Sequence, residues 1–408
     1  MMGSALYGHL WSTPESAALF SDEARTQAWL DILAALAAAQ AELGLVPAAA
    51  AADIADKADV DLLDLQRVGA RTRATGHSTL GLIQVLAEVL PPRSREWVYY
   101  GATVQDVTDT WTGLVMQRIG RFVFDDLRRA EAALLDLAAG HRDTIMVGRT
   151  HGQPGLPITF GFKTAVWAAE VRRHLDRLAQ AHCRWSVGQL AGAVGTGSFW
   201  GADALELQAR FCARLGLSPP DMTWLTARDR IAEFCALLAM VTGTVARIGH
   251  EVRTLQRPEI GEVAEAAPAG VVGSITMPHK RNPERSEHLG TLSRVVRSSA
   301  DLALEGMVCE HERDGTAWKT EWELLPRACT AAAACVASGA ELVAGLRVDT
   351  DRMASNLREQ RGYVMSEPVM RALAGDVGKH TAAELVHRAA RAGLERGQGF
   401  REALAADE

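Results

Sequence analysis

The chain has few cysteines, and they form no pattern that marks a metal site or a disulfide framework. Its six cysteines are scattered through 408 residues without a C-x-x-C pair, which argues against a thiolate zinc site and against disulfides. The chain also lacks an H-E-x-x-H segment and a Walker-type phosphate loop. We therefore expect no metal and no cofactor, and a reducing compartment, the cytoplasm.

Long blocks of like charge and long apolar runs are also scarce. The net charge is −7 without a long like-charge block, so nothing indicates nucleic acid or an anionic membrane as a partner. The N-terminus shows no basic segment followed by an apolar run and a cleavage site, so we expect no signal peptide. The apolar residues 331–346 are interrupted by Ser338, Gly339 and Glu341, which favours a packed helix over a membrane span.

Alternation of β-branched residues is almost absent, whereas helical periodicity recurs through nearly every segment. Residues 21–47 are typical of one helix, with Ser21 as its cap and Gly44 and Pro47 at its end. Further long helices are expected over residues 158–178, 184–215 and 227–256. Helices of this length with alanine-rich faces predict an all-α fold built on a long-helix bundle.

Residues 270–290, GVVGSITMPHKRNPERSEHLG, are too rich in glycine and proline for a regular helix or a central strand. We expect a loop, and loops of this kind carry chemistry more often than packing. The pattern G-S-x-x-M-P-x-K-x-N-P-x-x-x-E within it is too specific for an ordinary surface sequence. It supplies Ser274, Lys280, Asn282 and Glu287.

Two earlier stretches are also polar where helices begin. Residues 101–110, GATVQDVTDT, contain Thr103 and Gln105, and free N–H groups with hydroxyls at a helix start can hold a carboxylate. Residues 148–157, GRTHGQPGLP, place Thr150 and His151 in a loop before a long helix.

His77 lies between a glycine and a serine at the head of an apolar helix. By itself this position favours a capping or packing histidine over a catalyst. It is kept as a candidate substrate-binding residue.

The stretches 101–110, 148–157 and 270–290, in this order, resemble the three common regions of the fumarase/aspartase superfamily. This superfamily includes class II fumarases, argininosuccinate and adenylosuccinate lyases, and 3-carboxy-cis,cis-muconate cycloisomerases. The resemblance implies three helical domains, over residues 1–96, 97–346 and 347–408. It also implies a homotetramer whose core is the long-helix bundle and whose active sites each combine residues of three subunits.

The resemblance also implies roles for the motif residues. Removing a proton next to a carboxylate gives a dianionic aci-carboxylate, so the site needs a base, preorganised positive charge and an acid. Ser274 would be the base, as an alkoxide formed when the 270–290 loop closes. His151 would be the acid or a ligand of the leaving group, oriented by Glu287. The expected substrate-binding residues are Thr103, Gln105, Thr150, Lys280 and Asn282, together with His77 and Arg313 of the H-E-R-D segment.

Some positions depart from the family patterns. Leu6 and Trp322 stand where adenylosuccinate lyases usually carry phosphate-binding arginines, which argues against a phosphate-bearing substrate. Val104 replaces a usual serine, and Ile275 replaces the second serine of many relatives. Together with Trp318, Val104 and Trp322 suggest a fairly apolar pocket, although each could belong to the core.

The reaction within the family has alternatives. The segments FSDEARTQAWLD and HERDGTAWKTEW look closest to the cycloisomerase branch, where bacterial members often carry tryptophan at the position of His151. The retained Thr150-His151 pair suits elimination of a nitrogen leaving group. We therefore expect a C–N lyase that acts on a small succinyl-type dicarboxylate and releases a fumarate-like product. Cycloisomerisation of a carboxymuconate-like acid is the alternative, and a catalytically silent helical assembly protein is a third.

Overall fold

A computed structural model describes residues 4–267, 270 and 273–407. Helices dominate the described chain, which confirms the predicted all-α class. The α-helices are α1 (Pro14–Ala18), α2 (Asp22–Glu42), α3 (Ala48–Lys57), α4 (Leu65–Thr75), α5 (Leu80–Val89), α6 (Val104–Gly140), α7 (Phe160–Trp185), α8 (Ala204–Arg214), α9 (Asp229–Leu255), α10 (Glu284–Glu305), α11 (Gly315–Ala344), α12 (Thr350–Glu359), α13 (Ser366–Val377), α14 (Lys379–Glu395) and α15 (Phe400–Ala405).

Short elements connect these helices. The 3₁₀ turns are η1 (Gly8–Leu10), η2 (Val60–Leu62), η3 (Arg95–Trp97), η4 (Ser198–Asp203) and η5 (Tyr363–Met365). Two small antiparallel ladders pair β1 (Ile145–Thr150) with β2 (Gln153–Thr159) and β3 (Val263–Ala264) with β4 (Arg347–Val348).

The helix α2 follows the prediction from its sequence. The Ser21 hydroxyl accepts a hydrogen bond from the Ala24 N–H at 3.1 Å, so it caps the helix as expected. The helix ends at Glu42, and Gly44 has a φ of +72°, which a glycine adopts readily. The buried residues Leu30, Leu33 and Ala37 recur at three and four positions and form the apolar face.

Two predicted elements are wrong. The helix expected over residues 184–215 is broken, because α7 ends at Trp185 and α8 begins only at Ala204. Gly192, Gly195 and Gly197 in the intervening segment have positive φ values of +75°, +81° and +65°, which an α-helix does not contain. The loop expected over residues 148–157 belongs to the β1–β2 hairpin.

The chain folds into two compact units, each assembled from segments that are distant in sequence. Unit 1 comprises Met1–Asp126, His174–Gly243 and Thr291–Ala337, and unit 2 comprises Leu127–Arg173, Thr244–Gly290 and Ser338–Glu408. The three-domain division at residues 96 and 346 stays a prediction beside this description.

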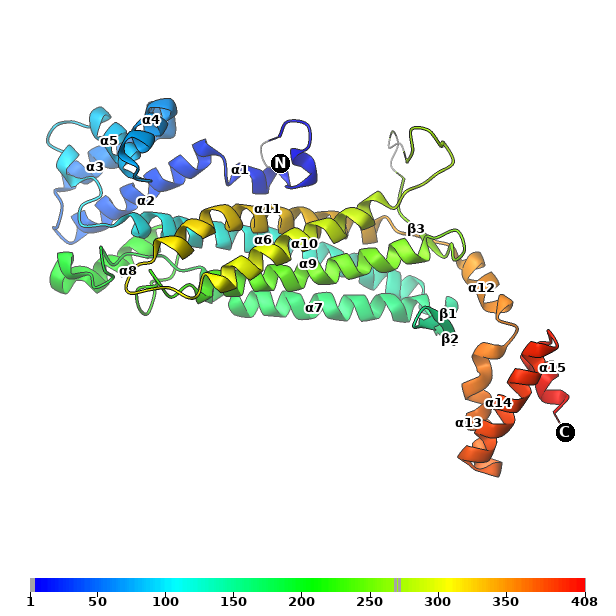
Figure 1. Ribbon diagram of the computed structural model, residues 1–408. Coiled ribbons are helices and arrows are strands. Elements are labelled where there is room, and N and C mark those ends of the chain that lie inside the picture. The colour runs from blue at the N-terminus through cyan, green and yellow to red at the C-terminus, as the bar shows by residue number, and fades with distance from the viewer. Residues whose placement is uncertain (1–3, 268–269, 271–272, 408) are drawn as a thin grey trace. The chain divides into compact units, whose positions relative to one another are not determined.

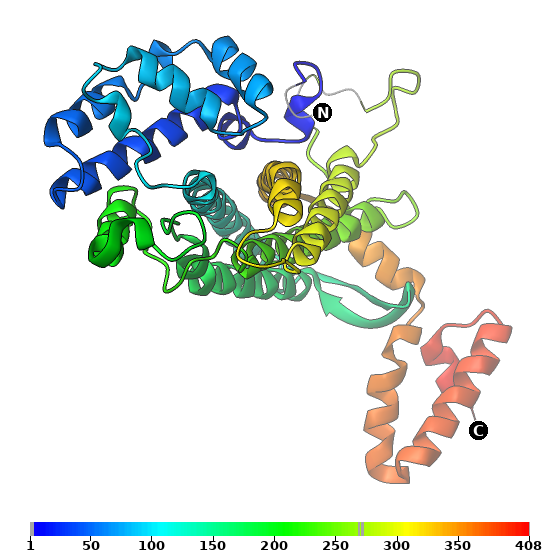
Figure 2. The ribbon, with the colours of Figure 1, turned by 60° about the vertical axis from the view of Figure 1, so that its left-hand side comes forward.

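Unit 1 contains the N-terminal helices and the adjoining parts of the long helices. In both views α4 and α5 lie side by side, and the long-helix segments of this unit run alongside one another (Figures 1 and 2). Their shared interior includes Met116 and Ile119 of α6, Phe234 of α9 and Leu324 of α11, all at most 1% exposed. This packing gives the long-helix bundle predicted from the alanine-rich sequence.

Unit 2 contains both small ladders and the C-terminal helices. The β1–β2 hairpin appears as a pair of arrows in Figure 2. Near the C-terminus, α13 and α14 form a helical hairpin joined at Gly378, and α15 packs against α14 (Figure 1).

The helices α9 and α11 are long and apolar enough to span a membrane by length and composition. However, 61% of the apolar window of α9 and 72% of that of α11 are buried inside the protein. Burial of this extent is typical of core helices.

A buried ion-pair cluster joins three elements of unit 1. Arg228, directly before α9, donates two hydrogen bonds to Asp109 of α6, at 2.8 and 3.1 Å. It also donates to both carboxylate oxygens of Glu321 on α11. The Arg228 and Asp109 side chains are 1% exposed and that of Glu321 is 7% exposed, so solvent screens these charges little. Burial raises the pKa of Asp109 and of Glu321. Burial acts to lower the pKa of Arg228, but the two carboxylates outweigh it and the pKa is raised.

We predict that Arg228→Met lowers the free energy of unfolding by about 3–5 kcal/mol, because it leaves two buried carboxylates without their partner. The exposed pair of Arg184 and Glu233 provides the control, since Arg184→Gln should cost no more than about 1 kcal/mol. Urea denaturation followed by circular dichroism measures both values. Equal small effects for the two variants would show that the buried cluster contributes no more to stability than an exposed ion pair.

Candidate active site

Thr103 and Arg313, two predicted substrate-binding residues, meet in unit 1. Thr103 directly precedes α6, and its N–H donates to the Asp106 carboxylate at 2.8 Å. Its hydroxyl accepts a hydrogen bond from Arg313 Nη2 at 2.7 Å, and the same nitrogen donates to the Ala193 carbonyl at 2.9 Å. The start of α6, the 186–197 segment and the residues before α11 therefore converge at one place.

Asp106 holds this convergence together. Its carboxylate also accepts hydrogen bonds from the N–H groups of Ala191 and Gly192, at 2.9 and 3.1 Å. Burial raises the pKa of Asp106 to about 6, although backbone N–H donors act in the opposite direction. The three donors fix the glycine-rich turn against the first turn of α6.

Gln105 points into the interior of unit 1. Its Nε2 donates to the Leu225 carbonyl at 3.2 Å and to Asp109 at 3.3 Å, and its side chain is fully buried. Its Oε1 is buried and accepts no hydrogen bond from the described residues. The assignment of Gln105 to substrate binding stays a prediction.

His77 caps a helix, as its sequence position suggested. Its Nδ1 accepts hydrogen bonds from the N–H groups of Thr79 and Leu80, at 3.4 and 3.3 Å, at the start of α5. A substrate-binding role for His77 stays a prediction beside this capping role.

Thr150 and His151 lie at the tip of the β1–β2 hairpin in unit 2. Thr150 is the last residue of β1 and pairs with Gln153, so His151 and Gly152 form a two-residue turn. Their φ values of +53° and +77° are those of a primed hairpin turn. The strands were missed because Pro154 and Pro157 lie in β2, and proline fits only where a strand donates no ladder hydrogen bond. The whole tip is exposed.

An ion pair between a half-buried arginine and a buried glutamate fixes the hairpin close to this tip. Arg149 of β1 donates two hydrogen bonds to the Glu262 carboxylate, each at 2.8 Å. Asn356 of α12 donates to the same carboxylate at 2.8 Å, and Glu262 is fully buried. This bidentate contact restrains the residue two positions before His151.

The predicted loop over residues 270–290 is shorter than expected, because α10 begins at Glu284 and Glu287 lies in its first turn. Val271 and Val272 are outside the described residues. The Glu265 carboxylate accepts hydrogen bonds from the N–H groups of Arg285 and Ser286 at 3.2 and 2.8 Å, which caps α10. The segment that leads into the loop is therefore attached to the helix that follows it.

Within the loop, Ser274 and Lys280 belong to one hydrogen-bonded turn around Met277. The Ser274 hydroxyl accepts a hydrogen bond from the Met277 N–H at 3.1 Å, and the Lys280 N–H donates to the Met277 carbonyl at 3.0 Å. Asn282 Nδ2 donates to Glu284 at 3.0 Å. Glu287 lies 3.5 Å from Arg253 Nε. Ser274 and Asn282 are half-buried, whereas Lys280 is exposed.

The predicted residues thus fall into two groups. Thr103, Gln105, His77 and Arg313 belong to unit 1. The residues of unit 2 are Thr150, His151, Ser274, Lys280, Asn282 and Glu287. Unit 1 by itself forms a pocket beside the first group, because Asp109, which accepts a hydrogen bond from Gln105, and Ser78, which follows His77, both line it.

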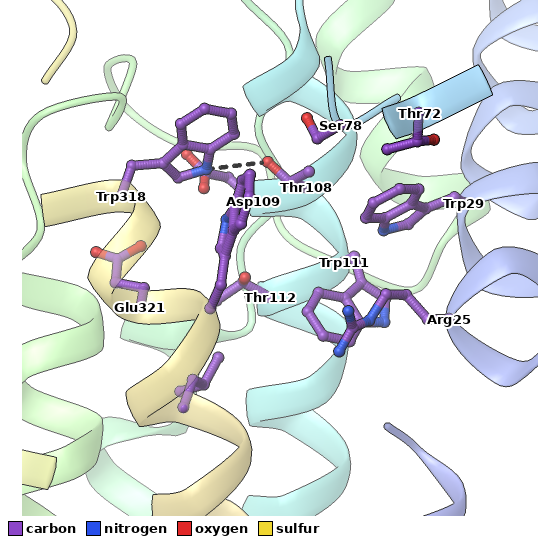
Figure 3. A pocket seen from close by; sticks show the side chains of 12 residues that line it. Arg25, Trp29, Thr72, Ser78, Thr108, Asp109, Trp111, Thr112, Trp318 and Glu321 are labelled. Atoms are coloured by element: carbon purple, nitrogen blue, oxygen red, sulfur yellow. Dashed lines mark hydrogen bonds between the residues drawn. The ribbon is translucent and has the colours of Figure 1, made fainter. Parts of the chain in front are cut away.

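This pocket has a volume of about 220 Å³ and is lined largely by tryptophan (Figure 3). The predicted apolar lining by Trp318 and Trp322 is confirmed, and their rings meet edge to face with centroids 4.8 Å apart. Val104 is buried but is not among the lining residues. The further tryptophans are Trp29 and Trp111, and Arg25 lies beside them.

Arg25 and Trp111 are not among the site residues predicted from the sequence. The available signal was the spacing of Arg25 and Trp29, four residues apart and hence on one face of α2. That spacing does not show which other helix faces them.

Comparison with known proteins gives a consistent result. Residues 11–298 match a protein family described as Lyase. The chain is 37% identical to N-acetyl-S-(2-succino)cysteine lyase of Dickeya dadantii, over 98% of this chain and 88% of the relative. It is also 37% identical to adenylosuccinate lyase of Methanocaldococcus jannaschii, over 98% of this chain and 87% of the relative.

The chain is also similar to a solved structure. The 3-carboxy-cis,cis-muconate lactonizing enzyme of Pseudomonas putida superposes with a TM-score of 0.92 at 31% identity, covering 99% of this chain and 90% of that one. The resemblance to the fumarase/aspartase superfamily, first indicated by three motif regions, is therefore confirmed, and it extends over nearly the whole chain. The chain is an enzyme that belongs to the Lyase family, within the fumarase/aspartase superfamily.

Proposed function

We propose that this lyase catalyses β-elimination from a succinyl conjugate, with release of a fumarate-like product. The observation that carries this proposal is the loop with Ser274, Lys280 and Asn282, which is attached through Glu265 to α10. The two relatives named above as lyases support a succinyl-type substrate through their names.

The proposed reaction begins at the carbon next to a substrate carboxylate. Ser274 Oγ, as an alkoxide, takes the proton, and the electron pair of the C–H bond moves into the carboxylate to give an aci-carboxylate. The Met277 N–H already donates to this oxygen, and such a donor stabilises the alkoxide. The pair then returns to form the C=C bond while the bond from the adjacent carbon to the leaving atom breaks. His151 gives the leaving atom a proton.

Lys280 supplies the positive charge on which the dianionic intermediate depends. The loop brings it near Ser274, because the backbone at Gly273 packs directly against the Lys280 carbonyl. A Cβ atom at Gly273 would lie 2.5 Å from that oxygen, which is closer than a real Cβ atom approaches. Only glycine therefore permits this arrangement of the loop.

The leaving atom is proposed to be nitrogen or sulfur. The sequence retains His151, a proton donor, and this favours a nitrogen leaving group. The Dickeya dadantii relative is named for a substrate that carries its succino group on sulfur, which adds a thiol leaving group. Cycloisomerisation is the second candidate, supported by the structural likeness to the lactonizing enzyme.

We also propose a cytoplasmic homotetramer in which each active site is shared between three subunits. On α7, Phe162 and Val166 are one turn apart, 61% and 47% exposed, which provides an apolar surface for another copy of the chain.

We predict that Ser274→Ala lowers kcat for fumarate release by roughly 10²–10⁴-fold, because the base at carbon is lost. The substrates to be tested are N-acetyl-S-(2-succino)cysteine, adenylosuccinate, argininosuccinate, N-substituted aspartates and carboxymuconate. Each reaction is monitored by the absorbance of fumarate or of the diene. Thr276→Ala removes a hydroxyl from the same loop and is the control. Loss of carboxymuconate diene absorbance without fumarate would establish cycloisomerisation instead, and an active Ser274→Ala variant would rule out Ser274 as the base.

We predict that Gly273→Ala lowers kcat/KM by about tenfold or more, because the added methyl group separates residue 273 from the Lys280 carbonyl and so displaces Lys280 relative to Ser274. The melting temperature should change little, since the loop is largely exposed. Gly140→Ala adds the same methyl group where no atom lies within 4 Å and serves as the control. Full activity of Gly273→Ala would show that this close approach is not required.

A further inference from the structure

We propose that Arg25 binds a carboxylate carried by the leaving group of the substrate, in the pocket lined by Trp29, Trp111, Trp318 and Trp322. This inference rests on the elimination proposed above and names the chemical class of the group that departs: small, partly apolar and anionic.

The pocket lies next to the residues predicted to bind the succinyl part. Thr103 contacts Arg313 at 2.7 Å, and five residues further along α6 Thr108 accepts a hydrogen bond from Trp318 Nε1 at 3.3 Å. Five residues of helix span about 7.5 Å. A substrate whose succinyl carboxylate lies at Thr103 can therefore place its other half among the tryptophans (Figure 3).

The charged residues that line the pocket differ in whether they have a partner of opposite charge. Asp109 and Glu321 each receive two hydrogen bonds from Arg228, so both carboxylates have a cationic partner. The Arg25 guanidinium has no hydrogen bond or ion pair with any residue that the structure describes. The uncompensated charge on the pocket wall is positive.

Arg25 is also held in a position that suits an anionic ligand. Its guanidinium carbon lies 4.8 Å from the centroid of the Trp111 ring, and its Nε is buried without an acceptor. Burial lowers the pKa of Arg25 more than the charge of Asp22, three residues earlier, raises it, so the guanidinium is incompletely solvated. A carboxylate offers two acceptors that match the planar guanidinium, and it restores the hydrogen bonds that burial removes.

The size and chemistry of the pocket restrict the rest of the leaving group. Pockets for drug-sized ligands occupy about 300–1,000 Å³, so a volume of about 220 Å³ suits a smaller group. The Trp29 Nε1 is buried without an acceptor, which provides a second donor for a polar atom of the ligand. A leaving group of amino-acid size, with one carboxylate and a short apolar part, satisfies these conditions.

The test compares two substrates that differ in one group: N-acetyl-S-(2-succino)cysteine and its analogue with the cysteine carboxylate converted to a carboxamide. Fumarate release gives kcat/KM for each. We expect the wild-type enzyme to prefer the acid by about 10- to 100-fold, as for a charge-assisted hydrogen bond. Arg25→Gln should bring this ratio close to one, and Arg25→Lys should retain part of it.

Arg118→Gln is the matched control, because it removes an exposed arginine from α6 that lies outside this pocket. It should keep the wild-type ratio. The melting temperature of Arg25→Gln should change little, since the variant removes a guanidinium that has no hydrogen-bonded partner among the described residues. A wild-type enzyme that releases fumarate equally from both substrates, or a preference that persists in Arg25→Gln, would overturn the inference and leave the elimination standing.

A binding measurement separates the two proposals if neither substrate yields fumarate. N-acetylcysteine and its carboxamide are titrated against the intrinsic tryptophan fluorescence of the wild-type enzyme and of Arg25→Gln. Binding of the acid alone, lost in the variant, supports the carboxylate site even though the elimination has failed. Equal binding of the two, or none, overturns the site.

Discussion

The buried contact of Arg228 with Asp109 and Glu321 is the interaction on which unit 1 depends. One guanidinium joins the residue before α9 to α6 and to α11, and it compensates two carboxylates that would otherwise face an apolar interior. Both carboxylates line the tryptophan pocket, so the contact also decides the charge of that pocket. Because Arg228 satisfies both, the charge of Arg25 remains available to a ligand.

Two carboxylates within four residues, Glu262 and Glu265, each join distant segments of unit 2. Glu262 binds Arg149 at the hairpin that carries His151, and Glu265 caps the helix that follows the Ser274 loop. The short strand β3 lies between these two carboxylates and pairs with β4. One segment therefore restrains both the hairpin that carries His151 and the helix that follows the Ser274 loop. A site built on exposed tips needs such anchors, because the tips have few packing contacts of their own.

The predictions succeeded where local chemistry decides the outcome. Ser21 caps α2, His77 caps α5, and the alanine-rich periodicity predicted long helices, because capping and amphipathicity involve residues within a few positions of one another. They failed at the β1–β2 hairpin and over residues 184–215. There, pairing of Arg149 with Glu262, and of Asp106 with the N–H groups of Ala191 and Gly192, depends on partners about a hundred residues apart. The periodicity of one segment contains no information about partners so distant in the sequence.

The sequence by itself determined the superfamily, the helical class and the motif residues Ser274, Lys280 and His151, since these depend on residue type and spacing along the chain. Only the tertiary structure decided which charges are compensated. Arg25 and Arg228 are both arginines near a tryptophan in the sequence, yet one lies unpaired on a pocket wall and the other bridges two carboxylates. The difference arises because α2, α6, α9 and α11 approach one another in space, and the strength of a charge interaction depends on distance and burial, which only the folded chain fixes.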